Sequence, residues 1–365
     1  MNILFSSLSG HDMTQSTHYL RVLQRMGHQV FRFAVPGDDT LVEDGRFVEP
    51  GYSPFTTLTS IVRQARFEPD LFLYIEPGGL IPLGMEESPF PTVCILCDTH
   101  QDLTARLNLA RFFDHVFLYH RNYADRFKEH PAGHVHWLPY ACDLELFYPR
   151  PVPRDLDVAF VGKLMINTDR KRILNETSRR WKVNEQRFYH QAEIPEVYSR
   201  AKIVLNMPLA DDLNFRTFEA MSCGAMLLTR RVANGQEILF QEGKHLVTFD
   251  TEQELFEKLE YYLAHSEERE AIAAAGYAEI QKNHNLEQRI EKLLQTVQEK
   301  PQGAAPLRRV SAPQVDYQYA WLYEWWKLLD PALTVVAHAR RAGRPWLHLL
   351  PPALRTLARR IKNKI

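Results

Sequence analysis

The sequence has few cysteines, no long apolar run and almost no net charge, and each of these absences excludes a class of protein. Its 365 residues include 4 cysteines, too sparse for a disulfide scaffold. Lys and Arg (44) nearly balance Asp and Glu (45), and a formal net charge of −1 provides no general attraction to nucleic acid. No stretch reaches the roughly 18 consecutive apolar residues of a membrane-spanning helix. We therefore expect a globular protein with no nucleic-acid partner.

Signals for export, redox chemistry and bound cofactors are also missing. Residues 1–8 carry no basic segment of a secretory signal, so we expect a cytoplasmic protein. Cys94 and Cys97 have the spacing of a redox pair, but they fall in an expected strand, where positions three apart point to opposite faces, and two packed thiols are the favoured interpretation. No zinc-binding arrangement stands out and no G-x-G-x-x-G predicts a dinucleotide, so we expect neither a required metal nor a cofactor.

The length suits two domains of about 150 residues with some chain left over. In the first half, helices are expected near residues 16–26, 55–66 and 123–129, between strands at 1–5, 28–34, 69–75, 91–97, 115–119 and 134–138. Such alternation is typical of a doubly wound α/β fold. The prolines of residues 139–153 predict a linker.

The second half repeats this pattern. We expect strands at residues 157–161, 201–207, 225–229 and 245–249, a short helix at 215–223, and a final run of helices at 252–263, 267–282 and 286–298. The predicted domains are therefore residues 1–150 and 151–300, each Rossmann-like, followed by an extension over 301–365.

The stretch from Asn206 to Gly224 organises the second half. An apolar strand ends at Pro208, Asn214 is expected to accept a hydrogen bond from the first helical turn, and Gly224 suits the left-handed position that closes a helix. In an open α/β sheet, ligands collect outside the carboxyl ends of strands, and a helix N-terminus there favours a phosphate. This loop is predicted to hold an anionic ligand.

The run Asn-Phe-Arg-Thr-Phe-Glu-Ala-Met-Ser-Cys-Gly-Ala-Met-Leu-Leu-Thr at 214–229 resembles the donor-site motif of GT-B glycosyltransferases, specifically the CgeB-like spore-maturation group, related to the retaining family 4 type. The resemblance implies two Rossmann-like domains facing across a cleft and transfer of a sugar, hexosyl-like and without a metal, from a nucleotide diphosphate sugar. Many relatives carry two glutamates separated by seven residues; here the second is Glu219 and the first is the shorter Asp211.

The same resemblance assigns roles to individual residues. Glu219 is expected to bind the ribose of the donor, and Asp211 the sugar hydroxyls. The predicted donor-binding residues, most of them directed at the diphosphate, are Gly162, Lys163, Arg170, Arg172, Asn214, Phe215, Arg216 and Glu219. A run of charges such as 170–172 is also typical of a solvated helix face, and that alternative stays open.

Three loops at strand ends of the first half are expected to build the acceptor side. Gly10, His11, Gly78 and Gly79 are the predicted acceptor-binding residues. Asp98 and His100 are candidates for deprotonating the acceptor or orienting the transferred sugar, because a histidine near a carboxylate can act as a general base near neutral pH. A histidine hydrogen-bonded within its loop is the alternative. Asp98, His100 and Asp211 together make up the predicted catalytic residues.

The resemblance does not cover residues beyond 300. The aromatic cluster at residues 317–326 is typical of a helix that packs back onto a domain. Residues 338–365 are basic, contain no acidic residue, and place Leu354, Leu357 and Ile361 on one helical face. Such a tail either docks peripherally on an anionic membrane, near a lipid-linked or glycan acceptor, or packs on the domains. Function likewise keeps alternatives: a non-catalytic nucleotide- or glycan-binding adaptor, or a nucleotide-sugar epimerase.

Overall fold

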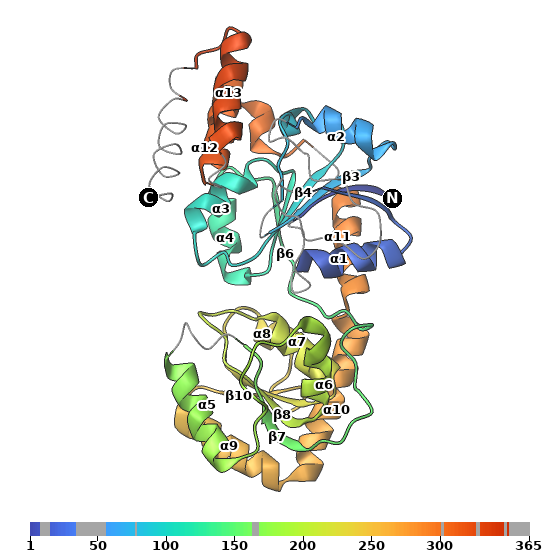
Figure 1. Ribbon diagram of the computed structural model, residues 1–365, viewed down its shortest axis with the longest axis vertical. Coiled ribbons are helices and arrows are strands. Elements are labelled where there is room, and N and C mark those ends of the chain that lie inside the picture. The colour runs from blue at the N-terminus through green and yellow to red at the C-terminus, as the bar shows by residue number, and fades with distance from the viewer. Residues whose placement is uncertain are drawn as a thin grey trace. The chain divides into compact units, whose positions relative to one another are not determined.

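The computed structural model describes residues 1–7, 15–33, 56–76, 79–162, 168–300, 303–325, 329–346 and 349. The chain forms two compact α/β units (Figure 1). The N-terminal unit comprises residues 1–119, 123–137 and 294–365, and the C-terminal unit comprises residues 120–122 and 138–293. These divisions lie elsewhere than the expected boundaries near 150 and 300: residues 138–150 belong to the C-terminal unit, and the extension belongs to the N-terminal one.

The N-terminal unit is built on a six-stranded parallel sheet with the order β2-β1-β3-β4-β5-β6. Its strands are β1 (Asn2–Ser6), β2 (Gln29–Phe33), β3 (Leu71–Ile75), β4 (Thr92–Leu96), β5 (His115–Leu118) and β6 (His134–Trp137). Strands β3 and β4 are buried at every position, as expected for the centre of a parallel sheet. Because all the pairings are parallel, the carboxyl ends of the strands share one edge.

Short helices connect these strands. They are α1 (Gln15–Arg25), α2 (Leu58–Ala65), η1 (Met85–Glu87), α3 (Leu103–Ala110), η2 (Arg121–Tyr123, at the unit boundary) and α4 (Ala124–Lys128). Helix α2 shows how local sequence sets the bounds: the Thr57 side chain accepts a hydrogen bond from Ser60 N at 3.2 Å, and Arg66 closes the helix at φ 57°. Asp102 caps α3 in the same way, through Ala105 N at 3.0 Å.

The extension supplies part of the N-terminal unit's core. It consists of η4 (Pro306–Arg309), α12 (Ala312–Trp325) and α13 (Leu329–Arg341). Helix α12 packs on α3 and α13, and Tyr319 and Tyr323 lie fully inside the same hydrophobic cluster as Phe113. The aromatic cluster therefore packs a helix onto a domain, as its composition predicts.

The C-terminal unit contains a four-stranded parallel sheet with the order β10-β9-β8-β7. The strands are β7 (Leu156–Ala159), β8 (Ala201–Asn206), β9 (Met226–Arg230) and β10 (Val247–Phe249). The helices are α5 (Thr168–Arg180), η3 (Gln191–Glu193), α6 (Ile194–Ser199), α7 (Phe215–Ser222), α8 (Gln236–Leu239), α9 (Glu252–Ala264), α10 (Ser266–Asn283) and α11 (Leu286–Glu299), which continues across the unit boundary. Gly224 ends the α7 turn at φ 76°, as predicted.

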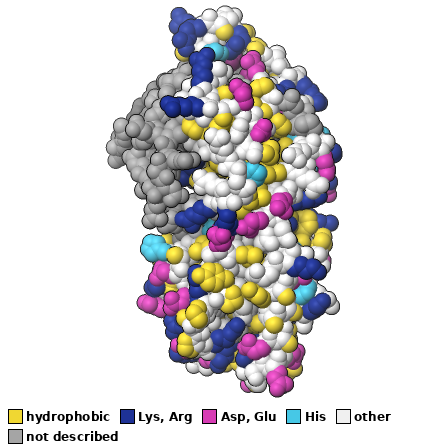
Figure 2. All heavy atoms as spheres, turned by 90° about the vertical axis from the view of Figure 1, so that its right-hand side faces the viewer, with side chains coloured by type: hydrophobic (Ala, Val, Ile, Leu, Met, Phe, Trp, Pro, Cys, Tyr) yellow, Lys and Arg dark blue, Asp and Glu magenta, His cyan; other side chains and the backbone are white. Residues whose placement is uncertain are grey.

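The surface carries both signs of charge. On the face drawn in Figure 2, Lys and Arg side chains are interspersed with Asp and Glu side chains, in keeping with a formal net charge of −1. Within the described ranges, no helix combines the length and apolar character needed to cross a membrane.

Candidate functional site

Three arginines gather at the carboxyl edge of the C-terminal sheet. Arg170 comes from α5, Arg216 from the first turn of α7, and Arg230 is the last residue of β9. The ring of Phe160, directly after β7, lies 5.4 Å from the Arg216 guanidinium and 6.0 Å from that of Arg170. Two helices and a strand that are far apart in sequence thus bring positive charge to the same edge of the sheet.

The electrostatics of this cluster favour an anionic ligand. Arg170 is buried, and burial together with the positive charges of Arg216 and Arg230 lowers its pKa to about 10. Gly162 lies against the same group, because a Cβ at this position would come within 2.9 Å of an Arg216 terminal nitrogen. Like charges held together raise the free energy of the unliganded site, and an anion would relieve that repulsion.

Asparagines at the end of β8 fix the Arg216 side chain. Arg216 donates to Asn206 Oδ1 at 2.9 Å, and the Asn206 amide also contacts Asn214 at 3.2 Å and Thr217 at 3.3 Å. The expectation that the Asn214 side chain caps α7 is therefore wrong: its backbone is extended, as at an N-cap, but the side chain makes no capping hydrogen bond because it pairs with Asn206 instead. In the first turn of α7, the Thr217 N–H instead donates to the Asn214 carbonyl oxygen at 3.1 Å.

The other predicted diphosphate residues have different surroundings. Arg170 also donates to the Met207 carbonyl oxygen, which orients it beneath the loop after β8. Arg172 is not brought into the cluster: it is exposed and forms a two-pronged ion pair with Glu252 of α9, with the Nη1 to Oε1 distance at 2.7 Å. Lys163 falls outside the described residues. Arg230 was not among the predicted donor-binding residues, although its place at the carboxyl end of a buried strand was a usable signal.

Glu219 and Phe215 share one face of α7, because they lie one helical turn apart. The Phe215 ring packs against Tyr140, with centroids 4.2 Å apart. Burial raises the pKa of the nearby Cys142 and Cys223 thiols, and the half-buried Glu219 carboxylate raises it further. Both thiols therefore stay protonated and neutral beside this carboxylate.

Asp211 joins three segments of the C-terminal unit. Its Oδ1 accepts from Ala233 N at 2.6 Å, in the loop after β9, and its Oδ2 accepts from Asn122 Nδ2 at 3.1 Å. The preceding Ala210 is held in the left-handed region at φ 51°. Each carboxylate oxygen can accept further hydrogen bonds, so this geometry is compatible with contact to a sugar hydroxyl.

In the N-terminal unit, Asp98 and His100 lie in one tight loop after β4. Asp98 adopts φ 45°, and its carbonyl oxygen accepts from Gln101 N at 2.9 Å, which closes the turn. Glu76, directly after β3, anchors the loop: Oε2 accepts from Cys97 N at 3.0 Å, and Oε1 lies 2.8 Å from Arg106. Burial, partly offset by Arg106, raises the pKa of Glu76 to about 7. The pairing of Glu76 with Arg106 was not predicted from the sequence.

The remaining acceptor-side residues are only partly described. Gly79 lies at φ 143°, and a Cβ there would be 2.5 Å from the Ser6 hydroxyl oxygen, so only glycine fits against the end of β1. Gly10, His11 and Gly78 lie outside the described residues.

Comparisons with known proteins relate this chain to glycosyltransferases. Residues 150–295 match a family model described as glycosyl transferase-like. A search of curated proteins finds no match. Among solved structures, Anabaena HepE in complex with UDP-glucose is similar at 16% identity and a TM-score of 0.59, over 82% of this chain and 100% of that one. Sucrose-phosphate synthase from Thermosynechococcus elongatus has 14% identity and a TM-score of 0.56, over 82% and 99%.

The chain has the GT-B fold. A third GT-B protein, described as an alpha-glucosyltransferase in complex with UDP-glucose and DNA containing an abasic site, is similar at 10% identity and a TM-score of 0.56, over 81% of this chain and 98% of that one. At these identities the likeness establishes the fold, which agrees with the sequence prediction. The arginine cluster lies within the matched residues 150–295, in the GT-B half expected to bind the donor.

Proposed function

We propose that this protein is a metal-independent glycosyltransferase that binds a nucleotide diphosphate sugar in its C-terminal unit and passes the sugar to an acceptor bound by its N-terminal unit. The observation that carries the proposal is the cluster of Arg170, Arg216 and Arg230 at the carboxyl edge of the sheet. The motif at 214–229 supports placement in the CgeB-like group, with family 4 as its retaining relative.

The roles follow from the chemistry of the groups. The arginines and the first turn of α7 would bind the diphosphate and offset the negative charge that grows on it as the sugar leaves. Glu219 would accept hydrogen bonds from the ribose, and Asp211 would orient the sugar. Asp98 and His100 are proposed to act on the acceptor. Solved relatives described with UDP or UDP-glucose make UDP the first nucleotide to test.

A non-catalytic adaptor is the second candidate, favoured by one observation: both oxygens of Asp211 are already engaged within the protein. Release of UDP from a UDP-sugar that depends on an added acceptor would establish the transferase and exclude the adaptor.

The test of the donor site uses two neighbouring arginines with the same charge. Arg230 belongs to the cluster, whereas Arg231 forms ion pairs with Glu242 at 2.7 Å and Asp250 at 3.2 Å. In calorimetry, wild-type protein should prefer UDP to uridine. Arg230→Gln and Arg216→Gln should each lose about 1.5–3 kcal/mol of that preference, the range for a hydrogen bond to a charged group.

Arg231→Gln is the control, because it removes the same charge one residue away. We expect it to bind UDP as the wild type does. If Arg230→Gln and Arg231→Gln lose UDP affinity equally, the effect is general electrostatics and not a contact in the cluster. If the wild type binds uridine as tightly as UDP, the phosphate site lies elsewhere.

A further inference from the structure

A buried carboxylate connects the extension to the N-terminal sheet. Asp114, fully buried just before β5, accepts from Thr92 N and Thr92 Oγ1 at 3.0 Å each. It also accepts from the backbone N–H groups of Gly303 and Ala305 at 3.0 Å, and from the Arg308 guanidinium at 3.2 Å. Segments about 190 residues apart in sequence therefore share one hydrogen-bonded centre.

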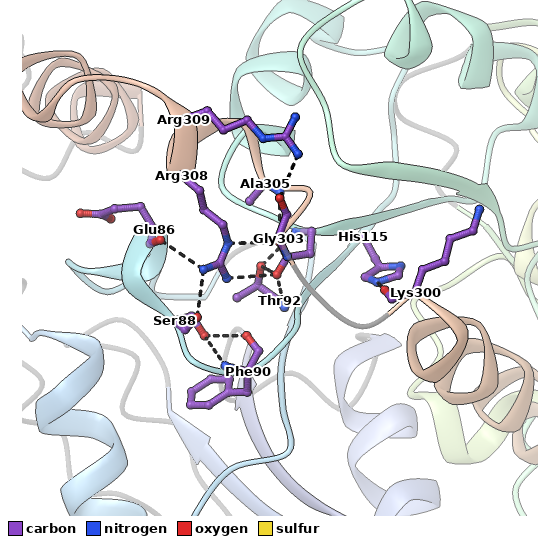
Figure 3. Close-up of polar contacts among 11 residues, drawn as sticks. Glu86, Ser88, Phe90, Thr92, His115, Lys300, Gly303, Ala305, Arg308 and Arg309 are labelled. Carbon is purple, nitrogen blue, oxygen red and sulfur yellow. Dashed lines mark hydrogen bonds and ion pairs between the residues drawn. The ribbon is translucent and has the colours of Figure 1, made fainter.

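From this centre, side chains of the extension reach the loop between β3 and β4. Arg308 Nη1 donates to the carbonyl oxygens of Glu86 at 3.2 Å and Ser88 at 2.9 Å (Figure 3). The Tyr319 hydroxyl accepts from Met85 N at 3.0 Å and lies 3.0 Å from the Pro82 carbonyl oxygen. The Tyr323 hydroxyl donates to the Ile81 carbonyl oxygen at 2.9 Å.

These contacts provide hydrogen-bond partners for main-chain groups of residues 79–88 that are not paired within a strand. Apart from the short η1, residues 79–88 form no helix or strand. Buried backbone groups need partners, and here the extension supplies partners for the main-chain groups of residues 81, 82, 85, 86 and 88. The other end of the loop is held by Ser6 Oγ, which donates to the Leu80 carbonyl oxygen at 2.6 Å, and by backbone bonds between Leu83 and residues 56 and 58.

The position of the loop gives this anchoring a functional meaning. The loop begins after β3 at the carboxyl edge of the sheet, where an open α/β sheet binds its ligands, and Gly79 packs directly on the end of β1. It ends at the opposite edge, where Arg308 joins residues 86–88 to Asp114 beside the first residues of β4 and β5. We propose that the extension is an acceptor-side positioning element: Tyr319 and Tyr323 fix the loop that follows Gly79 in the conformation that receives the acceptor, and Arg308 anchors the far end of the same loop. The part of this inference that concerns an acceptor rests on the proposed glycosyltransferase function. The part that concerns the fixed conformation of the loop rests on the contacts alone.

The test removes hydroxyl groups and keeps the rings. Tyr323→Phe and the double variant Tyr319→Phe/Tyr323→Phe remove the hydroxyl groups that bond to the loop. Tyr317→Phe is the matched control, because Tyr317 lies on the same helix and its side chain is exposed. Hydrogen exchange of residues 79–90 is measured in the full chain, together with the melting temperature and the affinity for UDP. Transfer from UDP-glucose to a panel of p-nitrophenyl glycosides gives KM for donor and acceptor separately.

We expect at least fivefold faster exchange in residues 79–90 for Tyr323→Phe, a larger effect for the double variant, and wild-type exchange for Tyr317→Phe. UDP affinity should stay at the wild-type value, and KM should rise for the glycoside but not for UDP-glucose. Unchanged exchange in the double variant overturns the proposal, and so does an equal rise of both KM values or a parallel loss of UDP affinity. Failure of the wild type to bind UDP would instead contradict the proposed function and leave the exchange result to decide the fixing of the loop.

Discussion

At the scale of single residues, Glu219 provides the sharpest test of the nucleoside half of the donor site. We expect Glu219→Gln to weaken UDP binding by about 1.5–3 kcal/mol, because an amide replaces a charged acceptor for the ribose hydroxyls. Wild-type protein should also distinguish UDP from 2′,3′-dideoxy-UDP in calorimetry, and the variant should not. If Glu219→Gln keeps the wild-type difference between the two nucleotides, the ribose lies elsewhere.

At the scale of elements, Asp114 decides how firmly the extension is attached. Burial alone would raise the pKa of Asp114, but the Ala305 N–H and the Arg308 guanidinium hold it below the ordinary value of 3.8. Asp114→Asn leaves the partly buried Arg308 without its counter-charge and should destabilise the protein by about 3–5 kcal/mol.

The pH dependence of this effect has a definite sign. Because the folded-state pKa is depressed, the stability that Asp114 contributes is fully present above pH 3.8 and is lost as the pH falls through the lowered folded value. In thermal or urea unfolding, the difference between wild type and Asp114→Asn should therefore be constant at neutral pH and shrink in acid. A difference that grows on acidification would contradict this assignment.

At the scale of the whole molecule, charge is unevenly distributed along the chain. The basic tail predicted over residues 338–365 is described at residues 338–346 and 349, and Arg344 there forms an ion pair with Asp316 at 2.7 Å. Residues 350–365, outside the described part, carry further basic residues and no acidic one, so the remainder of the chain is net acidic. We propose that this tail docks on an anionic membrane surface, with each basic residue near the surface worth about 1 kcal/mol. The full chain should co-sediment with phosphatidylserine vesicles in low salt, and a chain ending at Leu349 should not. Equal sedimentation of both chains, or binding indifferent to salt, removes the membrane proposal.

The sequence by itself determined the fold class and named part of the arginine cluster that we propose as the donor site. Alternating apolar runs and helical periods predict two Rossmann-like units, because parallel strands are buried on both faces and their connections are amphipathic. The loop after β8 was predictable for the same reason: a strand, a break and a helix start are local signals. Arg216 could be named from this loop, and Gly162 and Arg170 from the family resemblance of the segment after the first strand of this half; the structure brings these three together.

Only the tertiary structure decided which charged side chains lie close together. Nothing local in the sequence distinguishes Arg170, which faces Arg216, from Arg172, which pairs with Glu252, since the two differ only in the helix face they occupy. Arg230 joins the cluster because β9 pairs with β8 in parallel register. The partnership of Asp114 with Arg308 spans most of the chain, and such non-local contacts are set by packing of the whole unit, which a one-dimensional pattern does not encode.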